Sequence, residues 1–175
     1  MTFLFPLHPR FVHFPIALSL TGVALIILGL LLKRERWIEY GRFSLVLGWL
    51  GVLVASLTGL IDGARAPDSP AVQTVLNQHI TVGVSLLVVF GFAVYLPLRN
   101  RGLWNQASEP APRQTSAFQQ SHAIRPPRSL RTRRASRNQR ALFMALLVIG
   151  AGLILLEGWL GGRLVYSLGV GVAAH

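Results

Sequence analysis

The chain has 175 residues, of which 52% are hydrophobic and 13% are charged, and its formal net charge is +11. A small soluble domain could not hide so many apolar side chains from water, so the composition excludes an ordinary soluble globular protein. The absence of cysteine excludes disulfides, thiolate metal sites and cysteine-ligated iron–sulfur clusters.

Four long apolar runs follow one another along the chain. They cover residues 11–32, 43–61, 80–98 and 141–159. Each is close to the roughly 20 residues that a helix needs to cross a bilayer. Short connections join the first three runs, which favours antiparallel neighbours. The sequence therefore predicts an all-α polytopic membrane protein, a single domain over residues 1–175 that forms an up-down four-helix transmembrane bundle.

The distribution of lysine and arginine predicts the orientation of this bundle. Residues 33–42 carry four of them and residues 99–140 carry ten, whereas the opposite loops carry only Arg10, Arg65 and Arg163. Basic residues beside membrane spans collect on the cytoplasmic side, so we expect both termini to lie outside. The cluster KRER follows the first run instead of preceding it, which predicts a retained anchor and not a cleaved signal peptide.

The segment 99–140 is rich in Pro, Ser, Gln and Arg and has few large aliphatic residues. Such a composition cannot build a core, so we expect a mobile basic loop on the cytoplasmic side. It is either a solvated loop or a patch that docks anionic lipid or another subunit. Nucleic acid is not an expected partner, because the segment lacks interleaved aromatic residues.

Small residues predict where the helices approach closely. The second span has Gly51, Ala55, Gly59 and Gly63 at intervals of four, and the fourth span has Gly150, Gly158 and Gly162 on a comparable stripe. We therefore expect the second and fourth spans to pack together.

Unusual polar residues gather at the predicted outer ends of the spans. They are His8, His13, Asp62, His79, Glu157, Arg163 and Tyr166. Ionisable groups inside membrane spans are costly and commonly functional. The two acids lie near helix C-termini, where the helix dipole does not stabilise them, so each should have a basic partner or a histidine.

Two of these histidines suggest a cofactor. His13 lies about one turn inside the first span and His79 opens the third, so their imidazoles should reach a similar depth. Paired imidazoles on a helical bundle can bind a b-type haem, which predicts His13 and His79 as ligands of the haem iron and His8 as the alternative ligand. Arg10, Arg65 or Arg163 would then meet the haem propionates at the outer surface.

Other interpretations of the histidines remain open at this point. They could be interfacial or structural side chains, or they could bind a chlorophyll-type pigment. A zinc or copper site is less favoured, because no tight ligand spacing such as His-x3-His is present.

Four stretches resemble a known family: HPRFVHFPIAL at 8–18, TGLID at 58–62, NQH at 77–79 and GWLGGRLVYSLGVGV at 158–172. They are similar to the four-span bacterial membrane proteins grouped as domain of unknown function 2231. The resemblance implies a location in the bacterial inner membrane and a layout like that of small membrane cytochromes. By this resemblance, the family's histidines correspond to His8, His13 and His79, and its C-terminal motif corresponds to Gly161, Gly162 and Tyr166. The long basic loop departs from the family pattern.

The sequence thus leads to two hypotheses. In the first, the protein is not an enzyme but a haem-binding electron-transfer protein, a subunit of a larger membrane complex that exchanges electrons with an outer-side carrier. In the second, it is a cofactor-free accessory subunit of a respiratory or photosynthetic membrane assembly.

Overall fold

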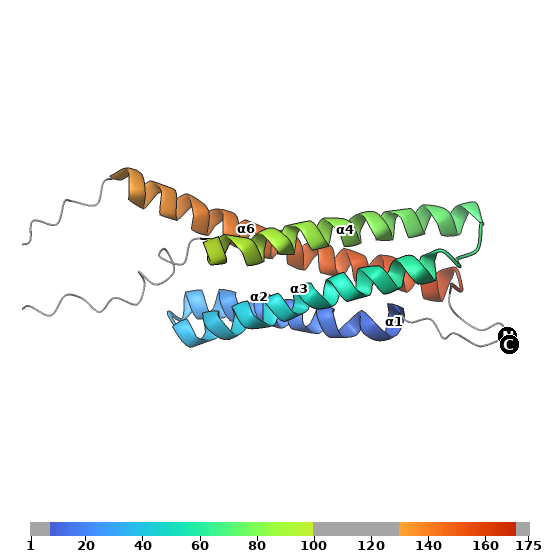
Figure 1. The fold of residues 1–175 in the computed structure, drawn as a ribbon, viewed down its shortest axis with the longest axis horizontal. Coiled ribbons are helices and arrows are strands. Elements are labelled where there is room, and N and C mark those ends of the chain that lie inside the picture. Colours follow the sequence, from blue (N-terminus) through green and yellow to red (C-terminus); the bar gives the residue numbers. More distant parts are fainter. Residues whose placement is uncertain (1–7, 100–129, 171–175) are drawn as a thin grey trace, which may run out of the picture.

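The computed structural model describes residues 8–99 and 130–170, with only the backbone course described for Arg10 and for residues 130–137. The described residues form helices joined by short turns, with no strand among them (Figure 1). Four of these helices are long and apolar enough to cross a membrane. The predicted fold class, an all-α membrane protein with four spans, is confirmed.

The chain runs through the bundle in the order α1 (His8–Phe11), α2 (His13–Leu31), α3 (Glu35–Gly63), α4 (Pro70–Arg99), α6 (Leu130–Gly162) and a short π-helical end, η3 (Arg163–Ser167). Successive long helices run in opposite directions (Figure 1). Neighbouring pairs in contact are α2 with α3, α3 with α4, α4 with α6, and α6 with α2, so α2 and α4 lie diagonally opposite each other.

Three helices begin well before the apolar runs that predicted them. Hydropathy marks only the part of a helix that suits lipid, whereas backbone hydrogen bonding continues until a local signal stops it. In α4 that signal is Ser69-Pro70, where the Ser69 hydroxyl accepts a hydrogen bond from the Val72 N–H at 3.3 Å. Proline at the first helical position costs no hydrogen bond.

Part of the basic segment that was expected to be a loop is helical. Residues 130–140 form the first turns of α6, so the prediction of one mobile loop over 99–140 is wrong for them. The rest of that loop, residues 100–129, lies outside the described residues.

The closest packing is between α2 and α3. A Cβ added at Gly22 would lie 2.8 Å from the Gly41 carbonyl oxygen and 2.8 Å from the Leu45 nitrogen. The Ser44 hydroxyl also donates a hydrogen bond to the Leu18 carbonyl at 2.8 Å. Backbone therefore meets backbone along this pair, as small residues permit in lipid.

The expectation that the second and fourth spans pack together is wrong. The second closely packed pair is α4 with α6, where Gly150 accommodates the ring of Phe90. On the predicted fourth-span stripe, Gly158 has nothing within 4 Å of its Cβ position. The glycines of α3 instead allow α1 and α2 to pack closely against it. Gly51, for example, faces Pro15.

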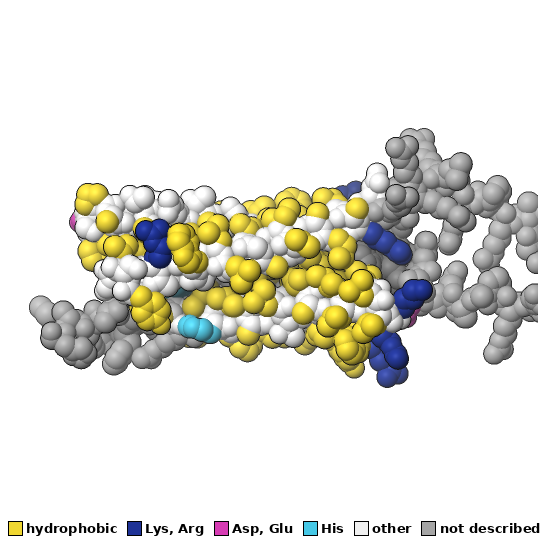
Figure 2. Space-filling model, turned by 180° about the vertical axis from the view of Figure 1, so that it is seen from behind, with side chains coloured by type: hydrophobic (Ala, Val, Ile, Leu, Met, Phe, Trp, Pro, Cys, Tyr) yellow, Lys and Arg dark blue, Asp and Glu magenta, His cyan; other side chains and the backbone are white. Residues whose placement is uncertain are grey.

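The bundle therefore consists of two helix pairs, α2 with α3 and α4 with α6, joined along a less tightly packed seam (Figure 1). Large apolar side chains cover its outside, and Figure 2 shows them along the whole bundle with lysine and arginine gathered mainly at one end. That end carries the α2–α3 turn, and the opposite end carries His8, Asp62, His79 and Glu157.

Candidate functional site

Four polar residues lie on the inner face of the bundle at one end because of their helical periodicity: His8, Asp62, His79 and Glu157. In α3 the buried positions Gly41, Leu45, Gly48, Val52 and Ala55 continue at the same spacing through Gly59 to Asp62. In α4, Val72 and Val75 lead to His79, and in α6 Glu157 follows Ile154 by three residues. A stripe of intervals of three and four lies on one helical face. Each residue therefore points inward because it occupies a core position.

His8 occupies the same kind of position on the first span. Counting back by seven from the buried Pro15 reaches His8, at the start of α1. Its Nδ1 lies 2.8 Å from the Ala55 carbonyl oxygen. Because a carbonyl only accepts, Nδ1 must carry the proton, which leaves Nε2 of the neutral ring with its lone pair.

Asp62 fixes the start of the helix that carries His8. Its Oδ2 accepts a hydrogen bond of 2.8 Å from the His8 backbone N–H. A carboxylate at a helix N-terminus satisfies an otherwise unpartnered N–H group and interacts favourably with the helix dipole. The partner of Asp62 is therefore a backbone group, whereas the sequence suggested an arginine or a histidine ring.

Glu157 lies beside His79 across the α4–α6 pair. His79 Nδ1 is 3.3 Å from Glu157 Oε1, and the two side chains are only 13% and 11% exposed. Among the described residues, neither His79 Nδ1 nor Glu157 Oε2 has an aligned hydrogen bond. The two groups are in ion-pair range but not in good hydrogen-bond geometry. This side of the site therefore holds buried polar atoms that lack an aligned hydrogen bond.

The two halves of the site meet at the seam between the helix pairs. The rings of His8 and His79 have their centroids 5.8 Å apart and are inclined by 83°. One ring belongs to the α1–α3 side and the other to the α4–α6 side. The site therefore brings two imidazoles together from the two halves of the bundle.

Glycines on three helices make room for these side chains. An added Cβ would lie 3.0 Å from His8 Nδ1 at Gly59, 3.0 Å from Glu157 Oε1 at Gly83, and 3.4 Å from His79 Cε1 at Gly161. These positions let α3, α4 and α6 approach the imidazoles and the carboxylate closely. The polar side chains themselves occupy the space beside these glycines.

His13, predicted as the first haem ligand, is not part of this cluster. It is exposed on the outside of α2, and its Nδ1 lies 2.9 Å from the Pro9 carbonyl oxygen. Five residues separate it from His8, which turns it about 140° away at 100° per residue. The structure therefore does not bring His13 to His79 as the sequence predicted; the histidine that meets His79 is His8.

The remaining predicted site residues lie at the rim. Arg163 is exposed and stacks over the Trp159 ring, with its guanidinium carbon 5.0 Å from the centroid. Tyr166 is 90% exposed, so it does not line the cluster. Arg10 lies in α1, and its side chain is outside the described residues.

The donor set suits a cofactor better than a bare metal ion. Within the described part of the chain, no group of three or more His, Cys, Asp or Glu side chains gathers as an ion site would require. Two neutral imidazoles do suffice for a haem, which supplies its own in-plane ligands. His8 and His79, whose rings lie 5.8 Å apart, would be the two residues that hold it.

The comparison with known proteins decides the family. The model of the family described as predicted membrane protein (DUF2231) matches residues 4–174, nearly the whole chain. The chain belongs to this family. No curated protein and no solved structure matches this DUF2231 protein. The structure thus agrees with the family resemblance drawn from the sequence motifs, and the motif residues His8 and His79 are those that meet at the seam.

Proposed function

We propose that this DUF2231 protein is a membrane electron carrier that holds one b-type haem through His8 and His79. When bound, the haem iron supplies reversible one-electron chemistry. The observation that carries the proposal is the juxtaposition of two imidazoles, 5.8 Å apart, from opposite halves of a membrane bundle.

The surroundings of both rings support a ligand role. Metal-binding histidines typically direct their second ring nitrogen to a backbone carbonyl or a carboxylate, which sets the tautomer and the ring orientation. His8 Nδ1 meets the Ala55 carbonyl, and His79 Nδ1 faces the Glu157 carboxylate. In both rings the nitrogen left for a ligand is then Nε2.

The chain's own residues would position the site and keep it dry. Asp62 anchors the helix start that carries His8, and Glu157 of α6 is the carboxylate that would orient His79 when a ligand is bound. The apolar residues Val75, Leu160 and Leu164 form a small buried cluster at the same end of α4, α6 and η3, which excludes water from this side. Exclusion of water around a metal-binding group is one of the factors that set its redox potential.

The family resemblance supports a location in the bacterial inner membrane, and the distribution of basic residues supports placing the histidine cluster near the outer leaflet. From there the protein would exchange electrons with an outer-side carrier or with other subunits of a membrane complex. The competing proposal is a cofactor-free accessory subunit, for which the same cluster is only a polar contact between helix pairs.

Absorption spectroscopy of the purified full-length protein, expressed with ample haem, tests the proposal. We expect a Soret band that shifts on reduction, and a pyridine haemochrome that identifies b-type haem. His8→Ala and His79→Ala should each lose the band. His13→Ala is the matched control and should keep it, since that ring faces outward.

Circular dichroism of each variant shows whether the helices are intact, so that loss of the band can be assigned to loss of a ligand. A colourless wild-type protein would overturn the haem proposal and leave the accessory subunit. A band that survives both His8→Ala and His79→Ala would overturn the ligand assignment.

A further inference from the structure

A second concave site lies at the opposite end of the bundle, between α3 and α4. It has a volume of about 240 Å³, and Phe143 of α6 forms part of its wall. Most of the wall is apolar, contributed by Leu45, Val46, Ala93, Val94, Pro97 and Leu98. The volume is below the roughly 300–1,000 Å³ of a site for a drug-sized molecule, so it suits a narrow apolar chain.

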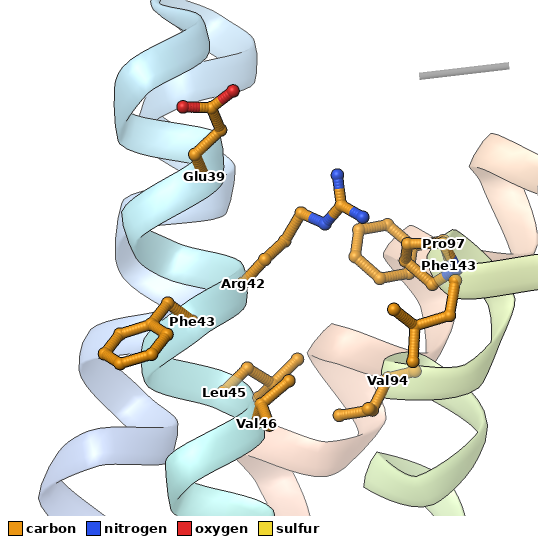
Figure 3. Close-up of a pocket in the computed structure, with 10 residues that line it drawn as sticks. Glu39, Arg42, Phe43, Leu45, Val46, Val94, Pro97 and Phe143 are labelled. Carbon is orange, nitrogen blue, oxygen red and sulfur yellow. The ribbon is translucent and has the colours of Figure 1, made fainter. Parts of the chain in front are cut away.

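One basic side chain lies at the mouth of this groove. Figure 3 shows Arg42 reaching from α3 across the groove, so that its guanidinium ends beside Pro97 and Phe143. Glu39, three residues before Arg42 on α3, also lines the groove (Figure 3). The groove therefore combines an apolar interior with a charged entrance that includes a cation.

Basic residues outnumber acidic ones around this groove. Among the residues whose side chains are described, the other basic residues at this end are Lys33, Arg34, Arg36, Arg99 and Arg140, against Glu35 and Glu39. Arg42 lies seven residues into α3, about 10 Å along the axis from the first residue of the helix, which suits the headgroup region of a bilayer. This is also the end that the lysine and arginine distribution predicts to face the cytoplasm, where anionic lipids attract basic residues.

We propose that this groove binds an anionic phospholipid, with the lipid phosphate on Arg42 and part of one acyl chain between α3 and α4. The apolar wall takes the acyl chain, and the guanidinium holds the phosphate by charge-assisted hydrogen bonds. The site is separate from the histidine cluster and does not depend on a haem. Its occupant would join the two helix pairs along the seam.

Native mass spectrometry of the delipidated full-length protein tests this proposal. The probes are phosphatidylglycerol and phosphatidylcholine with identical acyl chains, titrated into the protein in detergent. We expect phosphatidylglycerol to bind several-fold more tightly. Arg42→Gln should weaken its binding about fivefold, the effect expected of one basic residue near a membrane surface, while phosphatidylcholine binding changes little.

Three further variants distinguish lipid binding in the groove from general attraction to the basic end of the bundle. Arg36→Gln removes an exposed arginine at the same end and should change binding less than twofold. Arg42→Lys keeps the charge and should retain most of the affinity. Val46→Trp fills the groove and should reduce binding although every charge is kept.

Equal binding of the two lipids would overturn the proposal, as would equal effects of Arg42→Gln and Arg36→Gln. Full phosphatidylglycerol binding by Val46→Trp would also overturn it, because the lipid would then be held at the surface by charge alone. So would displacement of phosphatidylglycerol by an equal concentration of inorganic phosphate, since the acyl chain would then contribute nothing.

Discussion

Replacing Gly22 by alanine should destabilise the bundle, because this glycine lies where α2 and α3 meet backbone to backbone. The added Cβ would lie 2.8 Å from the Gly41 carbonyl oxygen, 2.8 Å from the Leu45 nitrogen and 3.1 Å from the Leu45 Cα. Favourable contacts between carbon atoms lie at about 3.5–4.0 Å, so the 3.1 Å contact with the Leu45 Cα is about 0.4 Å too short. The two contacts at 2.8 Å are shorter still, and backbone atoms cannot relieve them by changing rotamer.

The change in the free energy of unfolding is the balance of two opposing effects. Overpacking of this kind typically costs about 1–3 kcal/mol. Alanine in place of glycine also improves intrinsic helix propensity by up to about 1 kcal/mol. Gly152→Ala has the same propensity gain but no steric cost, since nothing lies within 4 Å of its Cβ position. The difference between the two variants cancels the propensity term and should equal the overlap cost, about 1–3 kcal/mol.

The assay is reversible unfolding in mixed micelles with increasing mole fraction of dodecyl sulfate, followed by circular dichroism. We expect Gly22→Ala to unfold at a lower mole fraction than Gly152→Ala. Equal midpoints for the two variants would refute the close approach of α2 and α3.

Three smaller predictions concern single side chains. Ser44→Ala removes the hydrogen bond to the Leu18 carbonyl and should cost about 0.6 kcal/mol, the average for interhelical hydrogen bonds in a membrane, in the same unfolding assay. Glu157→Gln removes the carboxylate that faces His79 and should lower haem retention on dilution roughly 10- to 100-fold, as loss of an outer partner does for other metal ligands; unchanged retention would remove Glu157 from the site. Tyr166→Phe should leave both stability and spectrum unchanged, within about 0.5 kcal/mol, because the side chain is 90% exposed; a lost Soret band would contradict its position at the rim.

The sequence predicted the number of membrane spans and their antiparallel order because hydropathy over about 20 residues reports the bilayer directly. It could not predict which helices pack most closely, because glycines recur on every span. The contact between Gly22 and Gly41 depends on the relative rotation of two helices, which tertiary packing decides.

The candidate site was predicted in part. His79 and Glu157 were both singled out, and the structure places them 3.3 Å apart. The preference for His13 over His8 rested on depth along the helix, whereas direction around the helix brings His8 beside His79. The correct signal was present: His8 lies seven residues before the buried Pro15, on the core stripe, whereas His13 does not.

The most direct test of the account is to measure which histidine position faces His79 in the membrane. The chain has no cysteine, so pairs of introduced cysteines can be cross-linked without background. In membranes treated with a short bifunctional thiol reagent, the His8→Cys/His79→Cys pair should cross-link rapidly, because the native rings lie 5.8 Å apart. The His13→Cys/His79→Cys pair should cross-link slowly or not at all, and preferential cross-linking of that pair would contradict the site described here.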